Sequence, residues 1–173
     1  TIFTLNINQL TMFQRLALKA LQQWADKEGR KPLVLRGARQ VGKTTLVELF
    51  SRNFDVFINL NLEEKNNANL FTMNNSFEDM LAGIYAKAGF RMENKRTLIF
   101  IDEIQNAPDA VQSLRYFYEK RPDLYVIAAG SLLESLVGDH ISFPVGRVEY
   151  MVLHPCTFTE FLGALGEDSL VEQ

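Results

Sequence analysis

The chain has 173 residues, of which 47% are hydrophobic and 23% are charged, which suits one soluble globular domain with a sizeable core. Acidic residues outnumber basic ones by 21 to 18, so the net charge of -3 gives no overall attraction to nucleic acid or to an anionic membrane. The single cysteine, Cys156, excludes an intrachain disulfide and fits a reducing compartment.

Neither a membrane span nor a secretory signal is evident in the chain. No apolar stretch approaches the roughly 18 residues that a bilayer-spanning helix needs, and the first residues lack a charged segment followed by an apolar one. We therefore expect a cytoplasmic protein. The sequence begins with Thr1 rather than methionine and stops soon after a helix is predicted to begin, so we expect residues 1–173 to be a fragment of a longer polypeptide.

The first predicted element is an amphipathic helix. Apolar residues recur every three or four positions from Leu10 to Trp24, which is the spacing of a stripe that packs on a core, and Gly29 is predicted to end the helix. Five short apolar runs follow, each bounded by polar or glycine-rich segments. They are predicted strands and begin at Leu33, Val56, Thr97, Leu124 and Arg147.

The stretches between these strands are long enough for helices. One is predicted after residue 43, one from Ser76, where Asp79 lies three residues on as in a capping box, and one from Asp109. A last helix is predicted near Phe158. Strands that alternate with helices predict an α/β fold, with a mostly parallel sheet that is covered by helices on both faces.

The segment GARQVGKTT follows the first predicted strand and matches the phosphate-binding pattern G-x-x-x-x-G-K-[ST]. Glycines let the backbone curl so that its N–H groups point at phosphate oxygens, and the next helix adds its positive N-terminal end. A glycine turn with an exposed lysine is the alternative. The residues expected to bind ATP are Gly37, Ala38, Arg39, Gln40, Val41, Gly42, Lys43, Thr44 and Thr45.

Three side chains of this segment have separate expected roles. Lys43 is predicted to reach the β- and γ-phosphates, and the Thr44 hydroxyl is predicted to bind Mg²⁺, whose remaining ligands are phosphates and waters. Arg39 either touches phosphate or a partner, or is simply solvated.

A second motif is the apolar run TLIFID followed by Glu103. Asp102, at the end of that strand, is expected to hold water on Mg²⁺, and Glu103 is expected to polarise the water that attacks the γ-phosphate. A carboxylate that activates water favours hydrolysis over transfer to another substrate. By itself an acidic pair after a strand is often only solvated.

With GARQVGKTT, LIFIDEIQ, AAGSLLES and GRVEYMVLHPCTFTEF in this order, the chain resembles prokaryotic AAA-type P-loop ATPases whose second half is a nuclease-like domain of unknown function. The resemblance covers roughly residues 30–162 on these motifs. It implies a three-layer sandwich with strand order 5-1-4-3-2. It also implies that a helical lid and the second domain are absent from this chain.

The resemblance places Ser131 where these ATPases carry a polar residue that senses the γ-phosphate. The alternative is that Ser131 caps the next helix, and both interpretations stay open. Arg147 precedes the last strand, on the side of a parallel sheet opposite the nucleotide. It therefore either acts in trans, as an arginine finger on a neighbouring subunit of a homo-oligomer, or forms a salt bridge with Asp139 or Glu149.

The leading hypothesis is an ATP hydrolase that converts Mg-ATP turnover into motion of an attached or partner domain. One alternative is a nucleotide-gated switch with negligible turnover, acting on an unknown protein client. Another is the ATPase of a DNA-handling system, although the acidic charge balance disfavours direct nucleic-acid binding by this domain. Neither His140 nor His154 has a second ligand at metal-binding spacing.

Overall fold

The computed structural model describes residues 15–72, 76–130 and 143–154. Its strands are β1 (Leu33–Arg36), β2 (Val56–Asn61), β3 (Thr97–Asp102), β4 (Tyr125–Gly130) and β5 (Glu149–Val152). Its helices are α2 (Arg15–Ala25), α3 (Lys43–Ser51), α4 (Lys65–Ala68), α5 (Phe77–Lys87) and α6 (Pro108–Lys120), with 3₁₀ turns η1 (Asn69–Phe71) and η2 (Ile104–Asn106).

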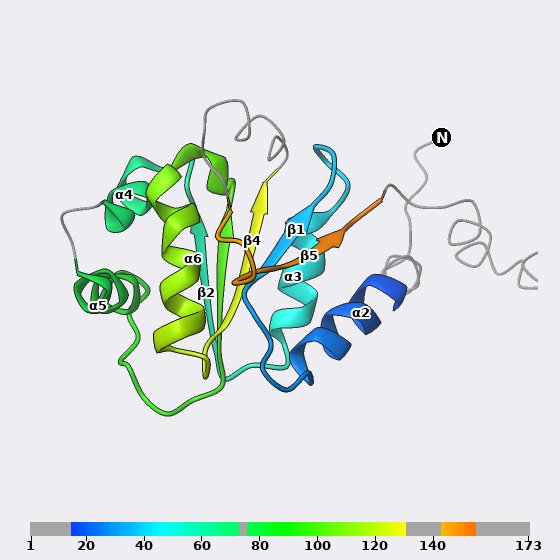
Figure 1. Cartoon of the computed structure of the whole chain (residues 1–173), viewed down its shortest axis with the longest axis horizontal. Coiled ribbons are helices and arrows are strands. Elements are labelled where there is room, and N and C mark those ends of the chain that lie inside the picture. Colours follow the sequence, from blue (N-terminus) through cyan, green and yellow to red (C-terminus); the bar gives the residue numbers. More distant parts are fainter. Residues whose placement is uncertain (1–14, 73–75, 131–142, 155–173) are drawn as a thin grey trace, which may run out of the picture.

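The five strands form one sheet that lies between two layers of helices (Figure 1). The strand order is β2-β3-β4-β1-β5, and every pairing is parallel. Counted from the other edge, this is the predicted order 5-1-4-3-2. The predicted fold class is therefore confirmed, and the sheet is parallel throughout the described strands rather than mostly parallel.

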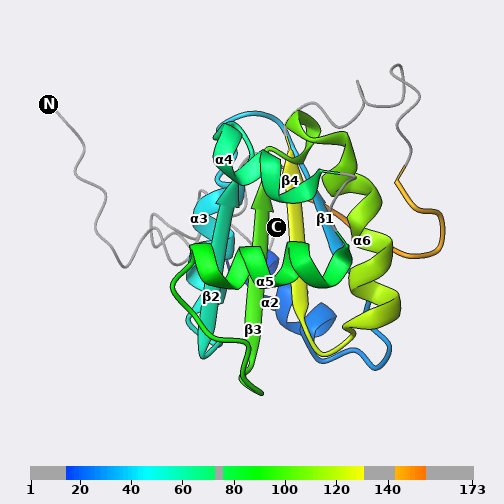
Figure 2. The ribbon, with the colours of Figure 1, turned by 90° about the vertical axis from the view of Figure 1, so that its left-hand side faces the viewer.

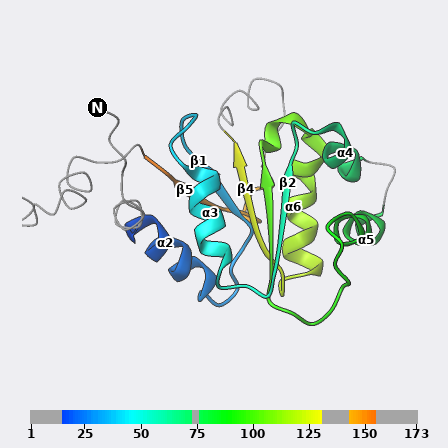
Figure 3. The ribbon, with the colours of Figure 1, turned by 180° about the vertical axis from the view of Figure 1, so that it is seen from behind.

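The central strands are buried on both faces, as the apolar run TLIFID predicts. All six residues of β3 are buried, and consecutive side chains point to opposite faces. Ile99 and Ile101 belong to the core beneath α5 and α6, which Figure 2 shows on the near side of the sheet. Leu98 and Phe100 belong to the core beneath α2 and α3, which Figure 3 shows on the other side.

Helix α2 ends earlier than the sequence predicted. It stops at Ala25 and continues into a turn, and Gly29, with a φ of 64°, lies in that turn. The Trp24 indole N–H donates to the Lys31 carbonyl at 2.8 Å and so ties the end of the helix to the segment before β1. The predicted start at Leu10 and the helix near Phe158 lie outside the described residues.

The predicted cap of α5 at Ser76 is confirmed, and Asp79 contacts the hydroxyl of Ser76. The Asp79 backbone N–H donates to the Ser76 hydroxyl at 3.1 Å, and that hydroxyl donates to the Asp79 carboxylate at 2.6 Å. In the part of the chain that the structure describes, no helix has the length and apolar character that crossing a bilayer requires.

Candidate functional site

The candidate site lies at the carboxyl ends of the strands, where residues 37–42 connect β1 to α3. Two glycines shape this connection. Gly42 has a φ of 91° and precedes the first residue of α3, a left-handed conformation that favours glycine. At Gly37 a Cβ atom would lie 2.5 Å from the Leu153 carbonyl oxygen, so only glycine fits against the chain after β5. Both glycines of the phosphate-binding pattern are therefore required by the local geometry.

Lys43 folds back over this loop. Its side chain is buried, and its ammonium donates to the carbonyls of Gly37 at 2.9 Å and Ala38 at 2.8 Å. These two bonds hold the cation at the loop rather than in solvent. The interpretation of this segment as a glycine turn with an exposed lysine is therefore wrong.

The two sequence motifs meet at Thr44 and Asp102. The Thr44 hydroxyl donates to the Asp102 carboxylate at 2.9 Å, which joins the first turn of α3 to the end of β3. Burial raises the pKa of Asp102 above its usual range, and the hydrogen bonds from Thr44 and from the Glu103 N–H act in the opposite direction. The hydroxyl and the carboxylate are oxygen donors of the kind that Mg²⁺ prefers, so the residues present fit this ion.

Glu103 stands beside them in a left-handed backbone conformation, with φ 51° and ψ 45°. Its backbone N–H donates to Asp102 Oδ1 at 3.0 Å, and its carbonyl accepts from the Asn106 N–H at 3.0 Å. Its carboxylate accepts a short hydrogen bond from the Gln105 side-chain amide. The tight turn η2 thus fixes the backbone of Glu103 directly beyond the strand end.

These residues surround one cleft of about 270 Å³. Its lining consists of residues that the sequence motifs predicted: Arg39, Gln40, Gly42, Lys43, Thr44, Thr45, Asp102 and Glu103. Gly37 and Ala38 form the loop beneath it through the carbonyls that bind Lys43. The Arg39 guanidinium extends outwards, 3.9 Å from Glu63, and both side chains are exposed.

No group of three or more His, Cys, Asp or Glu side chains gathers to hold a metal ion within residues 15–72, 76–130 and 143–154. A magnesium ion that is shared with phosphates needs only one or two protein oxygens, so Thr44 and Asp102 suffice for it.

Arg147 lies at the opposite end of the sheet, before β5 begins. Its Nε donates to the Glu119 carboxylate at 2.9 Å, and its side chain is 42% exposed. Arg147 therefore forms a salt bridge, as one interpretation predicted, but the predicted partner Glu149 is wrong, since Glu149 pairs with Lys27 at 2.7 Å. Asp139, the other proposed partner, and Ser131 both lie outside the described residues.

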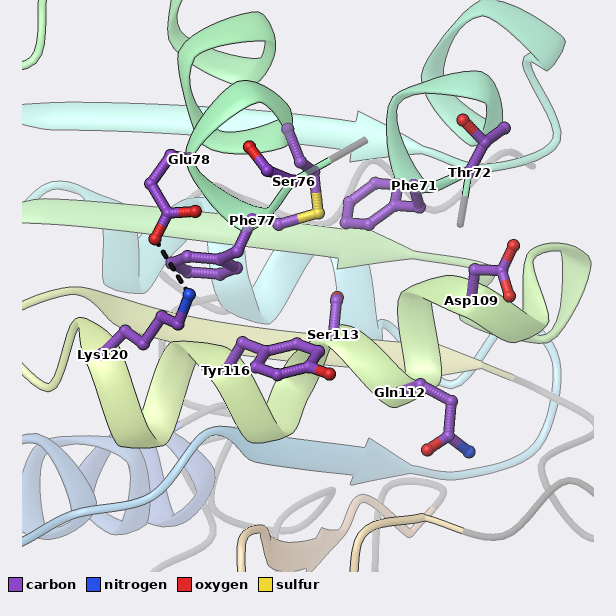
Figure 4. Close-up of a pocket in the computed structure, with 11 residues that line it drawn as sticks. Phe71, Thr72, Ser76, Phe77, Glu78, Asp109, Gln112, Ser113, Tyr116 and Lys120 are labelled. Carbon is purple, nitrogen blue, oxygen red and sulfur yellow. Dashed lines mark hydrogen bonds and ion pairs between the residues drawn. The ribbon is translucent and has the colours of Figure 1, made fainter. Parts of the chain in front are cut away.

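A second and larger hollow, of about 500 Å³, lies between α5 and α6 (Figure 4). Phe77 and Tyr116 form part of its wall, and the ion pair between Lys120 and Glu78, at 2.9 Å, closes one end. It contains neither the glycine loop nor the Thr44–Asp102 contact. The smaller cleft is therefore the candidate nucleotide site.

Two residues of the site were missed by sequence reasoning. Gln105 contacts Glu103, and the letters DEIQ contain it, but nothing in the sequence indicates that its amide turns back to the carboxylate. Leu153 lies on the phosphate loop, where its N–H donates to the Arg36 carbonyl at 2.7 Å and its own carbonyl faces Gly37. No sequence signal could have identified Leu153.

A sequence model described as an AAA domain matches residues 29–162. No curated protein matches the chain significantly. Among solved structures, the Walker-type ATPase PABY2304 of Pyrococcus abyssi has a TM-score of 0.58 at 16% identity, over 88% of this chain and 56% of that one. The Aeropyrum pernix ORC1 protein, solved in complex with DNA, has a TM-score of 0.54 at 15% identity, over 94% of this chain and 49% of that one.

The Aeropyrum pernix ORC2 protein is similar to the same degree, with a TM-score of 0.53 at 16% identity over 98% of this chain and 52% of that one. The chain thus spans about half the length of each of these structures. At such low identities the likeness concerns the fold alone. Since the family match covers most of the sequence, including the phosphate loop and the acidic pair, the chain belongs to the AAA family and is a P-loop ATPase domain.

Proposed function

We propose that this domain binds and hydrolyses Mg-ATP, and that turnover moves an attached or partner domain. The observation that supports this most strongly is the hydrogen bond between Thr44 and Asp102 with Glu103 at its side, all in one cleft with Lys43. A cation-binding pair, a phosphate-binding lysine and a carboxylate base are the groups that hydrolysis of a nucleoside triphosphate needs.

In this proposal the backbone N–H groups of residues 37–42 and the start of α3 bind the phosphates, and the Lys43 ammonium neutralises part of their charge. Thr44 and Asp102 hold Mg²⁺, which when bound stabilises the charge that develops on the phosphate oxygens. Glu103 accepts a proton from the attacking water, because its carboxylate lines the same cleft. Burial of Lys43 and Asp102 keeps these groups in a low-dielectric environment, where their electrostatic effect is larger than in water.

Nucleotide binding is tested by thermal unfolding with ATP, ADP and GTP in the presence of Mg²⁺, because a ligand that binds only the folded state raises its stability. Lys43→Ala should abolish the shift. Lys19→Ala is the matched control, since Lys19 is exposed on α2, away from the cleft. A shift that survives unchanged in Lys43→Ala would contradict the assignment of this loop.

Hydrolysis is tested by steady-state phosphate release. Glu103→Gln should keep the ATP-induced thermal shift but lose turnover, and Glu48→Gln, an exposed change on α3, should leave turnover as it is. Phosphate release by Glu103→Gln at the parental rate would refute the assignment of the base. A parental protein that binds ATP without releasing phosphate would instead indicate the nucleotide-gated switch.

We also propose that Arg147 acts in trans within a homo-oligomer. Its place just before β5, at the end of the sheet opposite the cleft, and its partly exposed side chain support this role. The attached domain would be the nuclease-like second half that the sequence resemblance implies. Salt-dependent binding of duplex DNA to this domain would favour a DNA-handling role.

A further inference from the structure

The side chain of Gln105 contacts Glu103, the proposed catalytic base. Gln105 lies in η2, two residues beyond Glu103, and its Nε2 donates a short hydrogen bond to Glu103 Oε2. Gln105 itself is absent from the lining of the cleft. Any effect of this side chain on the reaction must therefore act through Glu103.

The direction of the Gln105 amide is fixed by chemistry. An ionised carboxylate only accepts hydrogen bonds, so the NH₂ group of the amide must face Glu103 and the amide oxygen must face away. That oxygen, Oε1, is buried and has no hydrogen-bond partner in the part of the chain that the structure describes. An unpaired buried acceptor costs free energy, and an apolar side chain at position 105 would avoid that cost. Packing alone therefore does not explain a glutamine at this position.

The backbone of Glu103 also needs support. A left-handed conformation is strained for a residue with a Cβ atom, and such strain persists only where the surroundings hold it. The Asn106 N–H and Asp102 Oδ1 hold the Glu103 backbone, each at 3.0 Å. They do not fix the torsions of its side chain, which is the group that must meet the attacking water.

We propose that Gln105 is a positioning residue, whose amide holds the Glu103 carboxylate in the direction that accepts the proton of the attacking water. This inference rests on the proposed hydrolysis. It assigns no contact with the nucleotide to Gln105, and it predicts that the side chain affects the chemical step while leaving nucleotide binding alone.

The test compares the parental protein with Q105M, which keeps nearly the same length but has no donor, and with Gln112→Met, the same change at an exposed position of α6 outside the cleft. In Q105M we expect kcat to fall by about tenfold to a hundredfold, as misplacement of a catalytic group by an ångström does. KM and the ATP-induced rise in Tm should stay at parental values. Gln112→Met should change none of the three.

Q105E supplies a readout that a purely structural role would not move. The introduced carboxyl donates to Glu103 only when it is protonated, so the kcat of Q105E relative to the parent should rise as the pH falls, whereas that of Q105M should not. If Q105M does not fold, Q105E decides the question.

The two proposals fail in different ways. If the parent releases phosphate and Glu103→Gln does not, but Q105M keeps the parental kcat, only the inference about Gln105 is overturned. It is also overturned if kcat and the ATP-induced thermal shift fall together in Q105M. A parental protein without turnover would overturn the proposed hydrolysis, and the role of Gln105 with it.

Discussion

Gly37→Ala tests whether the chain after β5 supports the phosphate loop. The added Cβ would lie 2.5 Å from the Leu153 carbonyl oxygen and 3.1 Å from Val41 Cγ2. Comfortable contact needs about 3.5 Å, so the carbonyl must retreat by about 1 Å. It cannot do so freely, because the Leu153 N–H is bonded to the Arg36 carbonyl at 2.7 Å.

Overpacking of this kind costs about 1–3 kcal/mol of unfolding free energy. At about 2–4 °C per kcal/mol for a domain of this size, Tm should fall by about 2–12 °C. The carbonyl of Gly37 also accepts a hydrogen bond from the Lys43 ammonium. A shift of Gly37 should therefore displace Lys43 and reduce the ATP-induced rise in Tm as well. Both quantities are measured by circular dichroism melts, with and without Mg-ATP.

Gly29→Ala is the matched control for this experiment. Gly29 also has a positive φ, of 64°, but no atom lies within 4 Å of its added Cβ. Its substitution should cost about 1–2 kcal/mol through backbone strain alone, and should leave the ATP-induced rise in Tm intact. A Gly37→Ala protein with the parental Tm and the parental nucleotide shift would show that Leu153 does not press on the loop.

Two further predictions concern charged groups at opposite ends of the sheet. Because burial raises the folded pKa of Asp102, this carboxyl favours folding below its unfolded pKa and opposes it as the pH rises through the folded pKa. Asp102→Asn should therefore raise Tm at pH 7 in the presence of a chelator, and the increase in Tm should be smaller at pH 3. The variant should also lose the Mg²⁺-dependent part of ATP binding. A lower Tm at pH 7 would contradict this prediction. Arg147→Ala should lower turnover of concentrated protein with an unchanged ATP-induced thermal shift, and adding Glu103→Gln chains, which supply Arg147, should restore turnover. Equal turnover with and without Arg147 would exclude the role in trans.

Much of the cleft could be predicted from the sequence, because local patterns fix it. A buried strand, a glycine loop and a helix place Lys43 and Thr44 just beyond the carboxyl end of β1. Asp102 ends another parallel strand, so it lies at the same edge of the sheet. The hydrogen bond from Thr44 to Asp102 then follows from the strand order, which the family resemblance supplied.

Contacts between distant side chains could not be predicted in the same way. Arg147 pairs with Glu119 rather than Glu149, because the end of α6 lies beside the start of β5 and Lys27 already holds Glu149. Sequence patterns indicate which face a residue is on, but they do not indicate which of several carboxylates is nearest. The end of α2 at Ala25 was missed for a similar reason, since the bond from Trp24 to Lys31 depends on how the helix packs.

The position of β1 in the sheet affects when the nucleotide site can fold. β1 is made before both of its sheet neighbours, β4 and β5, and Leu33 pairs with Ile127 and Glu149. Pairing across such separations is slow, and during synthesis it must wait until the later strands have left the ribosome. The nascent chain therefore carries its phosphate-binding sequence before it can bind a nucleotide, and that affinity can arise only once β4 and β5 are available to pair with β1.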